Sequence, residues 1–175
     1  MEEVFLSESA FLGMIIASIE VFKKECIGIL LGHREGDRMT VNYALPYQSA
    51  KRGKSWVEPD LERDVECLEE LPFLSHLTHL GYFHSHTPAI GRRAVPKPSE
   101  EDIDSMAVGE LEIIVAINET IRPREWRTSR DGFLSGATER YSYDIGALYF
   151  HEQKRAWQQV EIVCPYAMGI HRAFC

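Results

Sequence analysis

The sequence predicts an α/β or α+β fold, with one mixed β-sheet flanked by helices. Short apolar runs bounded by glycine and turn residues indicate buried strands, and segments with apolar residues at helical spacing lie between the early ones. Strand-like segments then dominate the C-terminal part. The chain has 175 residues, of which 45% are hydrophobic, so we expect a single domain over residues 1–175 with its own core.

The first predicted elements are a strand, a helix and a hairpin. Residues 4–6 (VFL) can begin a strand, and Ser7 is a suitable N-cap for a helix over residues 8–22. The run ECIGILLG, residues 25–32, is short, apolar and closed by glycine, which predicts a buried strand. MTVNYALPY is its expected hairpin partner across the turn-like HREGDR.

The middle of the chain begins with the polar stretch QSAKRGKSWVEP, which we expect to be a loop, and Pro59 suits the first turn of the helix after it. The strand THLGYFHSH follows. Its alternation predicts one face formed by Leu80, Tyr82, His84 and His86. Ser99 begins a short helix over residues 99–108, and residues 111–118 form another buried strand. Three later segments, REWRTS, RYSYDIGALYF and AWQQVEIV, are expected as strands.

Composition excludes several classes of function. The net charge of -8 argues against a nucleic-acid surface, and no apolar run reaches the roughly 20 residues that cross a bilayer. The N-terminus is acidic where a signal peptide would be basic. The cysteines are scattered without a CxxC pair, which predicts reduced thiols in a cytoplasmic protein rather than a disulfide framework. They are Cys26, Cys67, Cys164 and Cys175.

Two short motifs could form a metal site. His84 and His86 lie one residue apart on a strand, so both imidazoles project from the same face and can share one ion. Zinc takes imidazole nitrogens and carboxylate oxygens at about 2.0–2.2 Å, and Asp102 in SEED could be the third ligand, in the first turn of a helix capped by Ser99. Each motif also has a structural interpretation, because His-x-His can be purely structural and Ser-x-x-Asp resembles a capping box.

An acidic residue precedes the first apolar strand. Glu25 stands directly before CIGILLG, where it is either a solvent-facing residue at a strand end or a functional carboxylate. A zinc hydrolase needs such a group as general base beside the attacking water, usually a carboxylate that does not bind the metal.

Taken in chain order, ECIGILLG, HSH and SEED resemble the motif of the JAMM (MPN-plus) metalloprotease family. That motif has a Glu before a Gly-containing strand, then His-Ser/Thr-His, then Ser-x-x-Asp. The resemblance implies the cytidine-deaminase-like mixed sheet of that family, with His84, His86 and Asp102 as Zn²⁺ ligands. It also implies that Glu25 is the general acid/base and that Ser99 helps to hold the oxyanion of the tetrahedral intermediate.

The resemblance implies a zinc-dependent isopeptidase that hydrolyses the amide bond between a ubiquitin-like modifier and its target. Two alternatives stay open: a zinc peptidase that trims the C-terminus of a sulfur-carrier protein, and a scaffold of MPN type that only binds partners. A nucleobase deaminase would need His-x-Glu and Pro-Cys-x-x-Cys, and a nucleotide-binding enzyme would need a glycine-rich phosphate loop; both motifs are absent.

The spacer between the two motifs departs from the family pattern. Twelve residues separate His86 from Ser99, more than the family usually has. Its basic residues, Arg92, Arg93 and Lys97, either contact an acidic partner or face solvent. Trp56 either lines the substrate cleft or anchors its loop, and His76 and His79 are interpreted as structural.

Overall fold

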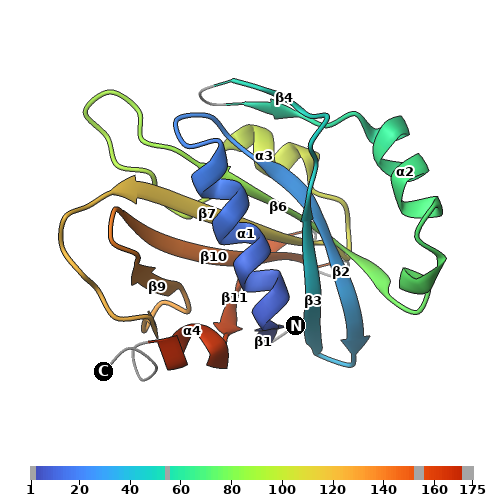
Figure 1. Cartoon of the computed structure of the whole chain (residues 1–175). Coiled ribbons are helices and arrows are strands. Elements are labelled where there is room, and N and C mark those ends of the chain that lie inside the picture. The colour runs from blue at the N-terminus through green and yellow to red at the C-terminus, as the bar shows by residue number, and fades with distance from the viewer. Residues whose placement is uncertain (1–2, 54–55, 152–155, 171–175) are drawn as a thin grey trace.

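The computed structural model describes residues 3–53, 56–151 and 156–170, and most of its strands belong to one sheet (Figure 1). The strands of this sheet are β1 (Glu3–Leu6), β2 (Ile27–Glu35), β3 (Arg38–Pro46), β6 (Thr78–His86), β7 (Leu111–Glu119), β8 (Arg127–Thr128), β9 (Leu134–Ala137), β10 (Tyr141–His151) and β11 (Ala156–Val163). A separate hairpin consists of β4 (Lys51–Arg52) and β5 (Val57–Glu58). The helices are α1 (Glu8–Glu20), α2 (Leu61–Glu69), the short 3-10 helix η1 (Pro72–Leu74), α3 (Glu100–Ser105) and α4 (Pro165–Gly169).

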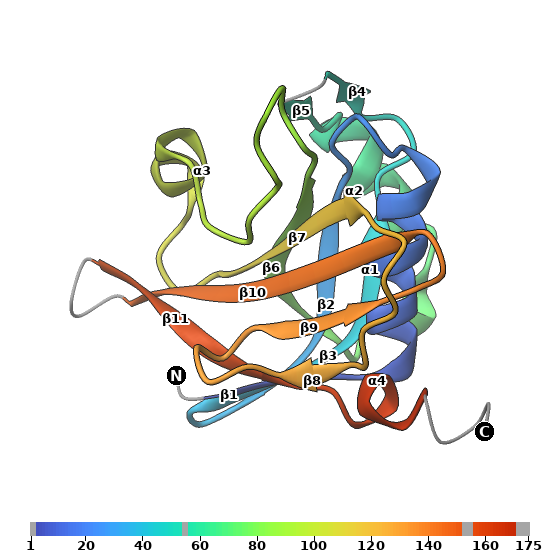
Figure 2. The same ribbon diagram turned by 90° about the vertical axis from the view of Figure 1, so that its left-hand side faces the viewer.

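The large sheet closes on itself, so the predicted mixed sheet flanked by helices is wrong. The strand order is β11-β1-β3-β2-β6-β7-β10, and β10 pairs again with β11, which makes a seven-stranded barrel (Figure 2). β9 and β8 extend from β10. Closure depends on β1, which pairs in parallel with β3 and with β11 and places Val4 beside Ile162. The cytidine-deaminase-like arrangement expected from the family resemblance is therefore replaced by a mostly stranded barrel with few helices.

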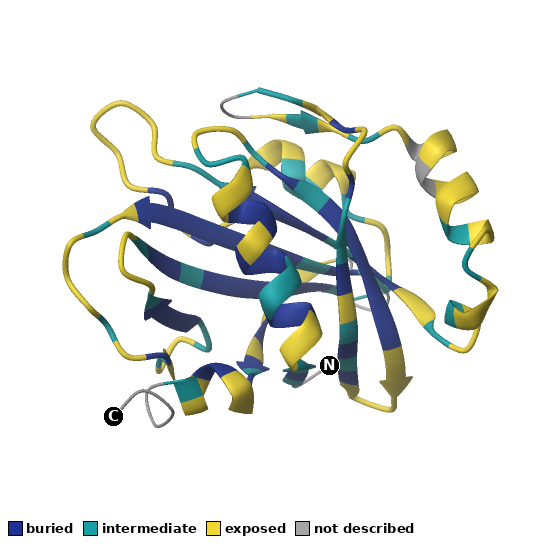
Figure 3. Cartoon of the chain, viewed as in Figure 1, coloured by how far each residue is buried: buried dark blue, intermediate teal, exposed yellow. Residues whose placement is uncertain are grey.

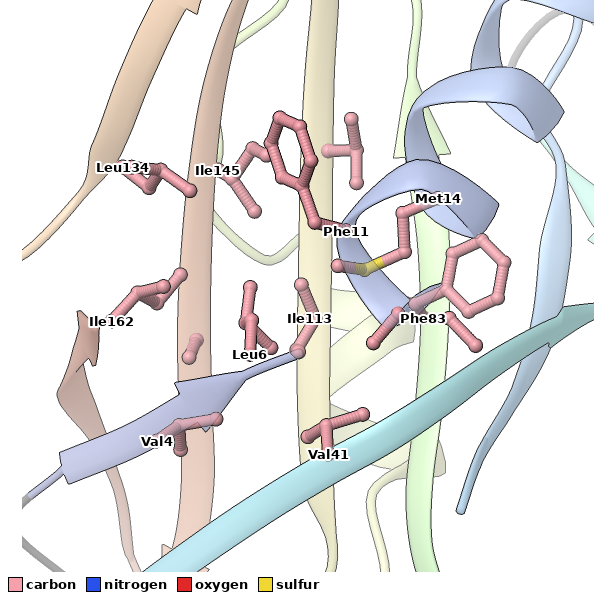
Figure 4. Packing of buried hydrophobic residues seen from close by; sticks show 14 of the residues in the cluster. Val4, Leu6, Phe11, Met14, Val41, Phe83, Ile113, Leu134, Ile145 and Ile162 are labelled. Atoms are coloured by element: carbon pink, nitrogen blue, oxygen red, sulfur yellow. The ribbon is translucent and has the colours of Figure 1, made fainter. Parts of the chain in front are cut away.

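Helix α1 packs against the inner face of the barrel instead of flanking a sheet. Ser7 caps it as predicted: its hydroxyl accepts a hydrogen bond from the N–H of Ala10 at 3.1 Å and donates one to the carbonyl of Asn42 at 2.6 Å. Phe11 and Met14 extend from α1 among the buried side chains of the strands (Figure 4). The main core thus lies between α1 and the concave side of the sheet.

Helix α2 lies at the periphery, and most of its residues are exposed (Figure 3). It begins at Leu61 with Asp60 as N-cap, so Pro59 precedes the helix and does not lie in its first turn. Leu68 is partly buried in a smaller apolar cluster on the outer side of β2, around Ile29 and Leu31. The polar stretch before α2, expected as a loop, contains the β4–β5 hairpin.

A β-bulge at Gly81 changes the expected face of strand β6. The register with β2 shifts here, and Gly81 adopts a φ of 143°, a backbone conformation that favours glycine. Leu80 consequently joins the main core together with Phe83, whereas Tyr82 contacts the outer cluster. The prediction that Leu80 shares a face with the two histidines is wrong because strict alternation ignores the bulge.

The other local predictions differ from the structure mainly at element ends. The helix expected over residues 99–108 ends at Ser105, the strand expected from residue 25 begins at Ile27, and β9 was not predicted. Cys26 and Cys164 are buried free thiols and Cys67 is an exposed one. Cys175 lies outside the described residues. Among the described helices, none has both the length and the apolar character needed to cross a membrane.

Candidate metal centre

The three predicted metal ligands meet where β6 ends and α3 begins. His84 Nε2 lies 2.9 Å from His86 Nε2 and 3.5 Å from one carboxylate oxygen of Asp102. His86 Nε2 lies 3.4 Å from the other oxygen of Asp102. The donor atoms of the three residues all fall within 4.8 Å of one another. His84 is buried, whereas His86 and Asp102 are partly buried, so the group is accessible to solvent on one side.

The capping box at the start of α3 sets the position of Asp102. The Ser99 hydroxyl accepts a hydrogen bond from the Asp102 N–H at 3.1 Å, and the Asp102 carboxylate accepts one from the Ser99 N–H at 2.7 Å. The capping-box interpretation of SEED is confirmed, and it is compatible with the metal-binding interpretation. The cap fixes the first turn of the helix and turns the carboxylate toward the two imidazoles.

Both histidines are oriented through their Nδ1 atoms. His84 Nδ1 lies 2.6 Å from Glu112 Oε1, and His86 Nδ1 lies 3.0 Å from the backbone carbonyl oxygen of Val95. A carboxylate and a carbonyl can only accept, so each Nδ1 carries a proton and each Nε2 faces the site, where it can bind a metal ion in place of a proton. Acceptors in this position are typical partners of metal-binding histidines, since they hold the ring and its tautomer.

Glu112 is a site residue that was not identified in the sequence. It lies on β7, which runs parallel to β6 and pairs Glu112 with Tyr82, two residues before His84. One signal could have found it: a carboxylate within the mostly apolar strand LEIIVAIN needs a partner, because an unpaired buried charge is costly.

The electrostatics of the group favour a positive charge between the ligands. Burial lowers the pKa of His84, but hydrogen bonds with Asp102 and Glu112 and the charges of both carboxylates raise it to about 10. Burial likewise raises the pKa of Asp102, and the hydrogen bonds with His84 and His86 outweigh it and hold this pKa well below its usual range. The pKa shifts of His84 and Asp102 thus point the same way: the Asp102 carboxylate stays ionised and stabilises a cation beside it.

The donor set fits Zn²⁺. Two ligand atoms that each lie 2.0–2.1 Å from a tetrahedral ion are about 3.3 Å apart, close to the separations between the imidazole nitrogens and the Asp102 oxygens. The two Nε2 lone pairs would repel each other without a proton or a metal ion between them. Two imidazoles and one carboxylate also leave a fourth coordination position open, as in catalytic zinc sites.

Glu25 and Ser99 line the same cleft as the three ligands. The cleft has a volume of about 840 Å³ and lies between α3, the β4–β5 hairpin and the segment after β6, which stand at one end of the barrel in Figure 2. Glu25 is partly buried, and burial raises the pKa of its carboxyl, an effect that nearby His86 and His84 partly offset. Its backbone N–H donates to the carbonyl of Gly53 at 3.2 Å, which ties it to the hairpin.

The remaining candidate residues also have defined places. Trp56 lines the cleft, and its indole packs over Gly53, so it both borders the cleft and anchors the hairpin. Arg93 donates to the Ser142 hydroxyl at 3.2 Å, and Arg92 is exposed beside the cleft. His79 lies 3.9 Å from Glu110 and His76 2.9 Å from the Phe73 carbonyl oxygen.

Comparisons with known proteins identify a similar fold but assign no function. No family model matches the chain, and no curated protein matches it. Among solved structures, the chain is similar to the solution structure of protein DSY2949 from Desulfitobacterium hafniense, with a TM-score of 0.63 and 18% sequence identity. The alignment covers 92% of each chain. At this identity the likeness concerns the fold alone.

Proposed function

We propose that the chain is a zinc-dependent hydrolase of amide bonds, and that it acts as an isopeptidase on a ubiquitin-like modifier attached to a target. One observation carries the proposal: His84, His86 and Asp102 converge in a cleft that Glu25 and Ser99 also line. The motif resemblance to the JAMM (MPN-plus) metalloproteases supports the same reaction. A bound Zn²⁺ supplies Lewis acidity, which lowers the pKa of a coordinated water and polarises a carbonyl group.

The residues of the chain have distinct roles in this proposal. Glu25 accepts the proton of the attacking water and delivers it to the leaving amine, since its raised pKa brings it closer to the working pH than that of an ordinary glutamate. The Ser99 hydroxyl accepts a hydrogen bond from the Asp102 N–H and keeps its own proton, which it can donate to the developing oxyanion. No cysteine nucleophile is required, and Cys26 is buried.

The shape and lining of the cleft favour a protein tail over a small substrate. An open cleft of about 840 Å³, bordered by the exposed side chains of Trp56 and Val95, can take an extended segment that passes the ligands. A target lysine joined through an isopeptide bond can approach from the open side. These features support a modifier as substrate, and the cytoplasm is the expected compartment.

The test uses purified protein with a panel of conjugates between ubiquitin-like modifiers and a lysine-containing target. We expect intact modifier and free target to appear with Zn²⁺ and to disappear with a chelator. Glu25→Ala should be inactive while it still binds one Zn²⁺ ion, because Glu25 is not a ligand. Mass spectrometry of the released product distinguishes cleavage of the isopeptide bond from removal of a single C-terminal amino acid from a sulfur-carrier protein.

Two results would contradict the proposal. Cleavage by Glu25→Ala at the wild-type rate would exclude the proposed general base. A purified wild-type protein that binds no Zn²⁺ at micromolar concentration would instead support the third interpretation, a scaffold that only binds partners.

A further inference from the structure

The segment between the two motif parts, residues 87–98, is attached to the barrel along its second half. Ala94 and Pro96 are buried, whereas Arg93, Val95 and Lys97 between and around them are exposed. Arg93 hydrogen-bonds to Ser142 on β10, and the carbonyl of Pro96 lies against Gly146 of the same strand. The segment therefore runs across the outer face of β7 and β10 and does not hang free over the cleft.

A buried asparagine holds the middle of this segment by two hydrogen bonds. Asn118 is only 3% exposed and lies near the end of β7. Its side-chain oxygen accepts a hydrogen bond from the Ala94 N–H at 2.8 Å, and its side-chain NH₂ donates to the Ala94 carbonyl at 3.1 Å. The Asn118 side chain thus binds both backbone polar groups of Ala94, which fixes the backbone at this residue in two directions.

The next carbonyl along the chain is the one that orients a metal ligand. Val95 follows Ala94, and its carbonyl oxygen accepts the hydrogen bond from His86 Nδ1 at 3.0 Å, while its side chain borders the cleft. His84 is held differently, because its Nδ1 binds Glu112 directly. Strand β7 therefore supports both histidines: Glu112 at its beginning acts by contact, and Asn118 at its end acts through two residues of the loop.

We propose that Asn118 is a positioning residue for His86, and that it works by holding Ala94 so that the Val95 carbonyl sets the ring orientation and tautomer of the ligand. The inference rests on the proposed function in that His86 binds the metal ion. An amide side chain is required at this position, since it offers one acceptor and one donor side by side. Leucine has a similar shape and would leave both backbone groups of Ala94 without these partners.

The test compares Asn118→Leu with a matched control, Ser135→Ala. Ser135 is a buried polar residue on β9 whose hydroxyl binds Asp144 at 2.6 Å, and it does not line the cleft. Loss of outer contacts to metal ligands commonly weakens metal binding by about 10- to 100-fold, so we expect Asn118→Leu to bind Zn²⁺ about tenfold more weakly than wild type. Chelator competition gives the affinities, and Ser135→Ala should keep the wild-type value.

Two further measurements do not depend on activity. The ¹⁵N signal of His86 Nδ1 in the metal-free protein should show the protonated, hydrogen-bonded form in wild type and lose it in Asn118→Leu. In unaltered protein, the amide of Ala94 should exchange with solvent more slowly than the amides of Arg93 and Val95. This second measurement needs no variant, and fast exchange of the Ala94 amide would overturn the role of Asn118 even if Asn118→Leu fails to fold.

The outcomes separate this inference from the proposed function. Equal Zn²⁺ affinity for wild type and Asn118→Leu, an equal loss in Ser135→Ala, or fast exchange of the Ala94 amide would overturn the role of Asn118. A wild-type protein that binds no Zn²⁺ would overturn the proposed function instead, and the positioning role of Asn118 toward a metal ligand would fall with it.

Discussion

The hydroxyl of Ser85 accepts a hydrogen bond from the backbone N–H of Cys26 at 2.9 Å, and the Ser85 N–H donates to the Cys26 carbonyl at 3.0 Å. Ser85 separates the two histidines in the sequence, and its side chain is completely buried on the opposite side of β6. Cys26 directly follows Glu25. This pair of bonds therefore links the strand that carries the proposed metal ligands to the residue proposed as general base.

Replacing Ser85 by alanine should displace Glu25 relative to the ligands. The buried Cys26 N–H loses its acceptor, which we expect to lower the free energy of unfolding by about 1–3 kcal/mol. The turnover number should fall more than KM changes, because proton transfer requires Glu25 at the reacting water. Ser85→Thr keeps the hydroxyl and should restore most of the turnover. Urea denaturation and steady-state kinetics check both parts, and an undiminished turnover number in Ser85→Ala would contradict the linkage.

Glu25→Gln should abolish hydrolysis while metal binding persists. Glutamine has nearly the same shape and cannot accept the proton, so we expect the turnover number to fall by about 10²- to 10⁴-fold. Isothermal titration with Zn²⁺ should give the wild-type stoichiometry, since Glu25 does not belong to the ligand group. A variant that loses the metal together with its activity would show that Glu25 contributes to the metal site itself.

The same substitution should change how the stability of the metal-free protein depends on pH. Burial raises the pKa of Glu25 in the folded state above the ordinary value of 4.5. At pH values between 4.5 and this raised pKa, the folded protein therefore carries the Glu25 proton more often than the unfolded protein does. Stability that is fully present below pH 4.5 is then lost as pH rises through the raised pKa. Glutamine cannot ionise, so Glu25→Gln should be more stable than wild type at pH 7 and equal to it near pH 4. Chelator-treated protein in urea at both pH values gives the comparison; an equal difference at both would exclude the titration of Glu25 as its cause.

Asp102→Asn separates the two roles of this residue. Asparagine can still accept the hydrogen bond from the Ser99 N–H, so α3 should keep its cap, but the negative charge beside His84 and His86 is lost. Free Zn²⁺ at 100 times its dissociation constant should stabilise the wild type by about 2.7 kcal/mol, and the variant at the same concentration should gain much less. Thermal unfolding with and without Zn²⁺ measures the gain. A full gain in the variant would show that the carboxylate is not a ligand.

Local features of the fold were predictable because they depend on neighbours in sequence. The N-cap at Ser7, the hairpin that pairs β2 with β3, and the strand that ends at His86 follow from capping residues, turn residues and alternation. Closure of the barrel was not predictable in this way. It depends on pairing between residues near opposite ends of the chain, such as Val4 and Ile162, and no local pattern records which edge strands meet.

The same distinction between local sequence features and long-range strand pairing applies to the candidate site. Residue type and spacing led to His84, His86 and Asp102, because a ligand set has a chemical signature that short motifs preserve. The supporting contacts of Glu112 and Asn118 come from a strand that reaches the site only through parallel pairing of β6 with β7. Such contacts carry no signature of their own in the sequence beyond a polar residue in an apolar strand.

Gly81 offers a direct test of how the bulge in β6 presents the two histidines. Its φ of 143° disfavours any other residue, and a Cβ here would collide with the backbone of Leu111 on β7. Gly81→Ala should therefore destabilise the protein by about 2–4 kcal/mol, because the backbone is strained and the parallel pair must open. It should also weaken Zn²⁺ binding, since His84 and His86 follow the bulge on the same strand. Gly91→Ala is the matched control: Gly91 also has a positive φ of 71°, but a Cβ there meets open space, so about 1–2 kcal/mol is expected and Zn²⁺ affinity should not change. Equal losses of metal affinity in the two variants would mean that the bulge does not determine how the ligands face the cleft.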